Sequence, residues 1–179
     1  PLKLNEKQTF TTFKISNEKK YQDWLKSNVF EQKQKGYYGV NIKILLGNFS
    51  SDTARVLAPI VEKYAADDIR ITVNQGLLLK YVPKEALPAL FQELDKLNFA
   101  EPGFDSVADI TACPGTDTCN LGISSSTGIA KELERVVIEE YPDLLFNNDI
   151  KIKISGCMNS CGQHSLAQIG FHGSSFKNG

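Results

Sequence analysis

The residues most able to do chemistry in this chain are four cysteines, which stand in two close pairs. The first pair is Cys113 and Cys119, the second is Cys157 and Cys161, and the sequence contains no other cysteine. Both pairs lie in turn-prone stretches that contain glycine. Four thiolates offered from two loops suit a [4Fe–4S] cluster, because each iron takes one cysteine sulfur. Glycine lets backbone N–H groups come close to the sulfurs and stabilise their negative charge.

The spacing of the cysteines argues against a zinc knuckle and against a thioredoxin-like redox pair. Five residues separate Cys113 from Cys119, whereas zinc knuckles favour about two to four residues between paired ligands. The chain also lacks the C-x-x-C pair of thioredoxin-like proteins. Structural disulfides and a structural zinc-binding module remain alternatives to the cluster. Metal analysis separates them, because a cluster brings iron and sulfide whereas a structural site brings zinc.

The cysteine motifs resemble a known family. The C-x5-C spacing, followed by Gly-Cys-Met-Asn-Ser-Cys-Gly-Gln over residues 156–163, resembles the cluster motif of the sirohaem nitrite and sulfite reductases. Upstream, Arg70-Ile-Thr-Val-Asn-Gln75 resembles the R-x-T-x-N-Q segment in that family's ferredoxin-like half-domain. The half-domain motif precedes the cluster motif, which is the order of the family's C-terminal half.

The resemblance implies a [4Fe–4S] cluster on the four cysteines and a sirohaem beside it. It implies that Cys161 bridges the cluster and the haem iron, which makes Cys161 the catalytic residue. Met158 stands where the family often has proline. The residues that match cofactor-contacting positions are Asn159, Arg70, Thr72, Asn74 and Gln75. For Arg70 and Thr72, a place on the wet face of a strand is the alternative.

The resemblance also implies a reaction, the six-electron reduction of sulfite to sulfide or of nitrite to ammonia. The cofactors carry that chemistry, and a ferredoxin or a flavoprotein would supply the electrons. The residues that would choose between sulfite and nitrite lie mainly in the family's N-terminal half. A stand-alone iron–sulfur electron carrier is the alternative function.

The match covers one half-domain and part of a cluster domain, whereas the family pairs two half-domains around the sirohaem. We therefore expect a fragment of a larger reductase, inactive when isolated and without either cofactor, whose partner is the missing N-terminal half. We expect self-association of the fragment through its uncovered sheet. A naturally short subunit is the alternative to a fragment.

The elements that position these residues are expected to form an α+β fold in three parts. Residues 1–36 are expected to form a polar arm with one helix, 37–103 a ferredoxin-like half-domain, and 104–179 an incomplete domain for the cluster and sirohaem. In the arm, Asn17 is a candidate cap for a helix, and Trp24 is interpreted as a packing anchor.

The half-domain follows a βαββα pattern. Apolar residues alternate with polar ones over 68–74 and in the first part of 40–46, which predicts strands, and another strand is expected over 77–82 after Gly76. Helical spacing predicts a helix capped by Ser51 or Asp52 and another containing Leu87 to Leu97. These residue patterns are read directly from the chain.

In the third part, apolar spacing predicts a helix around 129–138, a strand over 150–154 and a return strand over 166–171. The strand over 150–154 leads into the second cysteine pair. Lys151 and Lys153 on that strand are expected to be solvated rather than to contact substrate.

Composition sets the remaining bounds. Hydrophobic residues make up 41% of 179 residues and the formal net charge is −1, so nothing favours a nucleic acid or an anionic membrane as partner. No apolar run approaches the roughly 20 residues that span a bilayer, and the N-terminal sequence lacks the pattern of a secretory signal. We therefore expect a cytoplasmic protein, because thiols there stay reduced and can bind metal.

Overall fold

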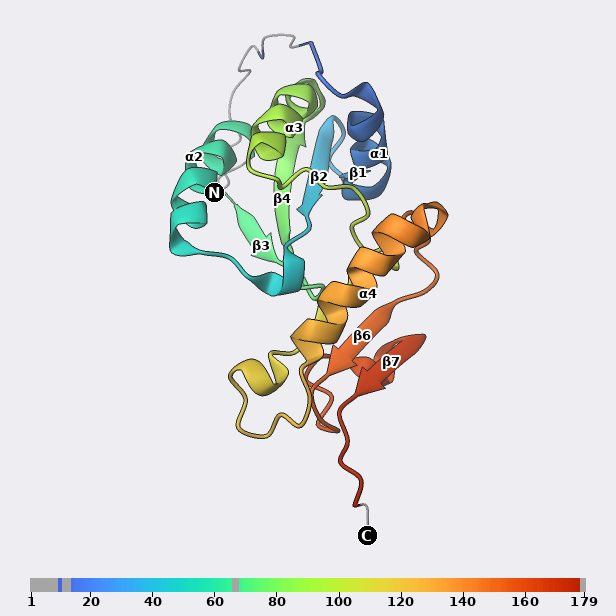
Figure 1. Cartoon of the computed structure of the whole chain (residues 1–179). Coiled ribbons are helices and arrows are strands. Elements are labelled where there is room, and N and C mark those ends of the chain that lie inside the picture. Colours follow the sequence, from blue (N-terminus) through green and yellow to red (C-terminus); the bar gives the residue numbers. More distant parts are fainter. Residues whose placement is uncertain (1–9, 11–13, 66–67, 178–179) are drawn as a thin grey trace. The chain divides into compact units, whose positions relative to one another are not determined.

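The computed structural model describes residues 10, 14–65 and 68–177 and divides the chain into two compact units, Pro1–Phe104 and Asp105–Gly179 (Figure 1). Both units combine helices with a β-sheet, which confirms the predicted α+β class. Among the described residues, no helix is both long and apolar enough to cross a membrane.

In the described part of the first unit, three α-helices accompany a four-stranded antiparallel sheet in the order β1-β2-β4-β3. From β2 onward the elements follow the predicted βαββα order. The elements are α1 (Glu18–Asn28), β1 (Val29–Glu31), β2 (Tyr37–Ile42), α2 (Ser51–Tyr64), β3 (Ile69–Ile71), β4 (Leu77–Pro83) and α3 (Leu87–Lys96).

Side-chain caps define where the first helices begin. The Asn17 side chain accepts a hydrogen bond from the Lys20 amide at 3.0 Å, as expected for the cap of α1. For α2, Ser50 is the cap rather than Ser51 or Asp52, because its hydroxyl accepts from the Thr53 amide at 3.0 Å.

The core of the first unit includes the segment that was expected to be a separate arm. Trp24 of α1 and Phe91 of α3 are fully buried, with ring centroids 5.3 Å apart. The strand β1 pairs antiparallel with β2, and residues 32–36 form the turn between them. Residues 18–36 are therefore built into the half-domain. Most of the arm before residue 14 lies outside the described residues.

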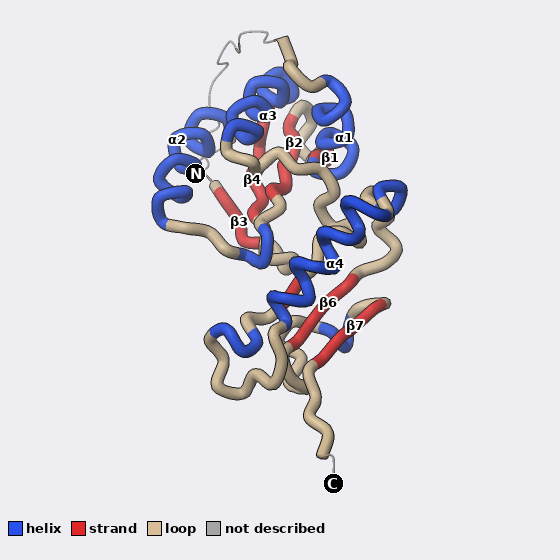
Figure 2. The backbone as a smooth tube through the Cα atoms, in the orientation of Figure 1, coloured by secondary structure: helices blue, strands red, loops and turns tan. Residues whose placement is uncertain are grey.

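The second unit is a three-stranded parallel sheet in the order β5-β6-β7, joined to one long helix. Figure 2 shows β6 and β7 side by side, with α4 next to β6. The elements are β5 (Thr111–Ala112), α4 (Ser126–Glu140), β6 (Ile152–Ser155) and β7 (Ile169–His172). The last strand begins later than expected, because residues 164–166 form a 3-10 turn.

The alternation of side chains along β6 gives its two faces different roles. Ile152 and Ile154 are buried, and α4 packs on β5 and β6. Lys151 and Lys153 point to the opposite face, because successive side chains of a strand alternate. The cysteine loops follow the carboxyl ends of β5 and β6, which meet at one edge of the sheet because the strands are parallel.

Candidate functional site

The two cysteine pairs are brought to one edge of the second unit by parallel strand pairing. Ala112 pairs with Ile154, and the Cys113 amide then donates to the Ile154 carbonyl at 3.1 Å. Cys113 directly follows β5, and Cys157 follows β6 by two residues. The chain between these strands is long, so the sequence alone did not show this pairing.

Gly156 joins the two cysteine loops. Its amide donates to Cys113 Sγ at 3.1 Å, and its carbonyl accepts from the amides of Ile123 at 2.8 Å and Ser124 at 3.1 Å. A Cβ atom at Gly156 would lie 2.6 Å from Gly115 Cα. Only glycine fits this junction, because the nearest atoms belong to the backbone.

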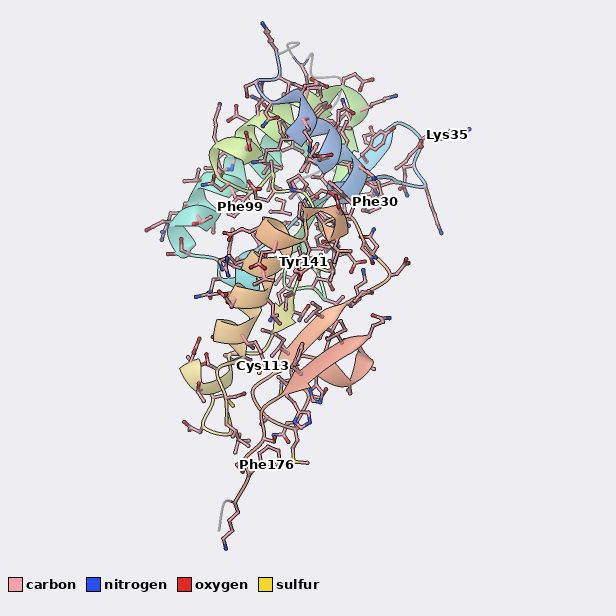
Figure 3. The ribbon with its side chains drawn as sticks, turned by 45° about the vertical axis from the view of Figure 1, so that its right-hand side comes forward. Phe30, Lys35, Phe99, Cys113, Tyr141 and Phe176 are labelled. Carbon is pink, nitrogen blue, oxygen red and sulfur yellow. The ribbon has the colours of Figure 1, made fainter. Side chains whose placement is uncertain are left out.

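The thiol of Cys113 lies in a polar pocket of backbone and hydroxyl groups. Cys113, labelled in Figure 3, is 8% exposed. Ser126 at the start of α4 donates to the Cys113 carbonyl at 2.7 Å. The Ser126 hydroxyl also lies 3.5 Å from Cys113 Sγ. Burial raises the pKa of the Cys113 thiol, but hydrogen bonds, above all the one from the Gly156 amide, outweigh it and bring the pKa below its ordinary value. This environment favours a thiolate.

The other three thiols are more open. Cys119 and Cys161 are exposed and Cys157 is half-buried, and none of the four cysteines forms a disulfide. Among the described residues, no group of three or more His, Cys, Asp or Glu side chains is gathered tightly enough to hold a metal ion. The donor chemistry fits a [4Fe–4S] cluster, because the four donors are soft thiols on two loops and one already receives a backbone N–H.

The turn that carries Cys161 is held by backbone and serine contacts. Ser160 and Gln163 take left-handed φ angles of 59° and 60°, and the Gly162 amide donates to the buried Ser155 hydroxyl at 3.1 Å. Asn159 and Met158 project into solvent from this turn, so neither contributes to its packing.

The half-domain residues that match the family motif lie in the first unit, in β3 and the hairpin that follows it. Thr72 closes this hairpin: its amide donates to the Gly76 carbonyl at 2.9 Å, and its hydroxyl accepts from the Gly76 amide at 3.0 Å. The predicted strand over 68–74 therefore ends at Ile71. Arg70 is exposed, with Nε 3.1 Å from the Asp68 carboxylate. Asn74 and Gln75 occupy the turn itself, and Gln75 has a φ of 63°.

Sequence reasoning did not identify Ser126 or Lys153 as parts of the site. Ser126 follows the cap of α4, and a run of serines before a helix was the available signal. Lys153 was expected to be solvated, yet it is half-buried and its Nζ donates to Gln163 Oε1 at 2.9 Å. No pattern in the sequence indicates that contact, because it joins a strand to a loop.

Comparison with known proteins gives the class of the first unit. Residues 30–97 match the family described as the nitrite/sulfite reductase ferredoxin-like half domain. A ferredoxin–nitrite reductase of Synechococcus elongatus is 28% identical over 84% of this chain and 30% of its own length. An assimilatory-type sulfite reductase of Nitratidesulfovibrio vulgaris is 32% identical over 79% of this chain and 63% of its own length.

A solved structure extends the match to both units. The Mycobacterium tuberculosis NirA protein superposes with a TM-score of 0.72 at 27% identity, over 86% of this chain and 28% of that chain. The first unit therefore contains a match to this reductase half domain, and the chain as a whole is similar to nitrite and sulfite reductases. It spans less than a third of the cyanobacterial relative and under two thirds of the sulfite reductase.

Proposed function

We propose that this chain supplies the [4Fe–4S] and sirohaem site of a nitrite or sulfite reductase, which carries out six-electron reduction of its substrate. The supporting observation is the junction at Gly156, whose amide meets Cys113 Sγ at 3.1 Å and ties the first cysteine loop to the second. This contact brings together the two loops whose spacing resembles the family's cluster motif.

The residues proposed to hold the cofactors are those that match the family's motifs. The cluster ligands would be Cys113, Cys119, Cys157 and Cys161. The residues proposed to contact sirohaem are Asn159, Arg70, Thr72, Asn74 and Gln75. When bound, the cluster and sirohaem supply one-electron transfer and the reduction chemistry. The Gly156 amide would hold the Cys113 thiolate in place and offset its charge, and Arg70 could attract anionic groups because its guanidinium is exposed.

Relatives support the choice of substrate and donor. The Synechococcus and spinach relatives are ferredoxin–nitrite reductases, which supports nitrite as substrate and ferredoxin as electron donor. Sulfite is the second candidate, because the Nitratidesulfovibrio relative is a sulfite reductase. The half-domain match over residues 30–97 disfavours a stand-alone electron carrier, which would need only the cysteine-bearing unit.

A second half-domain is the proposed partner of the first unit. The edge strand β3 leaves Ile71 85% exposed, and Val73 just after it is 67% exposed. An uncovered apolar edge favours pairing with another chain or domain. We therefore propose that the chain needs the other half of the reductase for turnover and self-associates without it.

Serine in place of Cys161 tests the proposed role of this thiol as the bridge between cluster and sirohaem. In the reductase that contains this sequence, Cys161→Ser is expected to lower nitrite or sulfite turnover by about 100-fold or more, because a thiolate proposed to hold both cofactors is lost. Reduced viologen serves as electron donor in the assay.

Met158→Ala is the matched control, because Met158 lies in the same turn and is 78% exposed. This variant is expected to keep near-normal turnover. Near-normal turnover by Cys161→Ser would show that the bridging role belongs elsewhere.

A further inference from the structure

The face of β6 opposite Ile152 and Ile154 contacts the loops through polar side chains. Lys153 Nζ donates to Gln163 Oε1 at 2.9 Å and makes a longer contact of 3.4 Å to Thr111 Oγ1. Thr111 is also the register partner of Lys153 across the parallel pair β5–β6. The lysine side chain therefore reaches one segment on a neighbouring strand and another on a loop.

Both contacts of Lys153 flank the proposed ligands. Thr111 stands two residues before Cys113, and Gln163 stands two residues after Cys161. Lys153 itself lies in β6, the strand that precedes the second cysteine pair. The amino group of Lys153 thus contacts both a residue that precedes the first cysteine pair and a residue that follows the second pair.

Ser155, the next polar residue on this face of β6, also contacts the turn that carries Cys161. Ser155 Oγ accepts from the Gly162 amide at 3.1 Å, directly before the residue that Lys153 contacts. Lys151, one step earlier on this face, instead pairs with the Asp105 carboxylate at 2.8 Å. Lys153 is therefore distinguished from its neighbour by its contact with the cysteine turn.

Burial also sets Lys153 apart. Burial lowers the pKa of the Lys153 amino group, and the carboxylates of Asp105 and Asp109 act in the opposite direction. The amino group donates hydrogen bonds in either protonation state. Its contact with Gln163 therefore does not depend on where it titrates.

We infer that Lys153 is a positioning residue of the cysteine site, where its amino group holds the turn of Cys157 and Cys161 to the sheet beside the strand that leads into Cys113. The value of this contact for a cluster rests on the proposed function. The contact itself joins two side chains of this chain, so the two claims are tested separately.

The first test uses the iron-free chain and measures amide hydrogen exchange over residues 157–166. Lys153→Met removes the donor but keeps most of the aliphatic stem, and exchange in this segment is expected to rise about 10-fold, as for loss of one hydrogen bond to a charged group. Lys153→Arg is expected to restore most of the protection. Lys151→Met is the matched control and is expected to leave the segment unchanged.

A second variant removes the acceptor and covers the case in which Lys153→Met does not fold. Gln163→Asn shortens the side chain but suits the left-handed backbone at this position, and it is expected to raise exchange in the same segment. Unchanged exchange in Gln163→Asn and in any folded Lys153→Met overturns the inference, whether or not the chain binds iron.

The second test measures loss of iron to a chelator after anaerobic reconstitution. Lys153→Met is expected to lose iron about 10-fold faster than Lys151→Met, the scale seen when residues that support metal ligands are removed. Equal rates overturn the role of Lys153 toward the cluster. Failure of the unsubstituted chain to take up iron contradicts the proposed function instead, and hydrogen exchange then decides the role of Lys153.

Discussion

Alanine at Gly162 is expected to disrupt the cysteine site and to abolish iron uptake. Its Cβ would lie 1.9 Å from the Ile154 carbonyl oxygen and 3.0 Å from the Cys113 amide nitrogen. Both are backbone atoms, one in β6 and one just after β5, and they are hydrogen-bonded to each other at 3.1 Å, so they cannot move aside without separating the turn from β6. The substitution is expected to destabilise the second unit by about 3 kcal/mol. Thermal unfolding and iron content after anaerobic reconstitution measure the effect.

Gly128 provides the matched control for this substitution. A Cβ at Gly128 meets only the Ser125 side chain, at 2.8 Å from its hydroxyl oxygen, and alanine favours the helix by up to about 1 kcal/mol. Gly128→Ala is therefore expected to keep its iron, with a stability change below about 1 kcal/mol, because displacing the Ser125 cap opposes the gain in helix propensity. Wild-type stability and iron uptake in Gly162→Ala would show that the turn does not pack against β6 as described.

Serine in place of Cys113 is expected to reduce the iron bound after reconstitution from about four per chain to near zero, because each iron of the cluster takes one cysteine sulfur. Cys113 is the most buried of the four thiols and the one that receives the Gly156 amide. A serine hydroxyl is a harder and shorter donor, which poorly replaces a thiolate on iron. Iron and acid-labile sulfide are measured per chain.

Thr127→Ala is the control for Cys113→Ser. Its hydroxyl donates to Oδ2 of Asp117, which lies within the first cysteine loop, at 2.7 Å, without contacting a cysteine. The control is expected to keep a full complement of iron. Full iron content in Cys113→Ser would remove Cys113 from the ligand set.

Much of the fold could be predicted because the signals are local. The apolar spacing of α3 and the apolar run at the start of β4 appear within short stretches, and the structure contains both elements close to the expected bounds. The strand β1 was missed, because three residues carry little pattern and form a strand only by pairing with β2. The end of β3 depends on hydrogen bonds between Thr72 and Gly76, which a pattern of alternation does not reveal.

The candidate site was predictable in its donors but not in its supports. The types and spacing of the cysteines indicated thiolate chemistry, whereas the contact of Gly156 with Cys113 depends on strand pairing between distant segments. Lys153 was expected to be solvated because alternation places it opposite a buried face. That reasoning could not show that the side chain of Gln163, in the loop after Cys161, accepts a hydrogen bond from Lys153.

The most direct test of the central claim is the metal content of the unsubstituted chain after anaerobic reconstitution with iron and sulfide in the presence of competing zinc. A [4Fe–4S] cluster on Cys113, Cys119, Cys157 and Cys161 predicts about four irons and about four sulfides per chain, with the Mössbauer spectrum of such a cluster. One zinc per chain with no iron uptake would contradict the account.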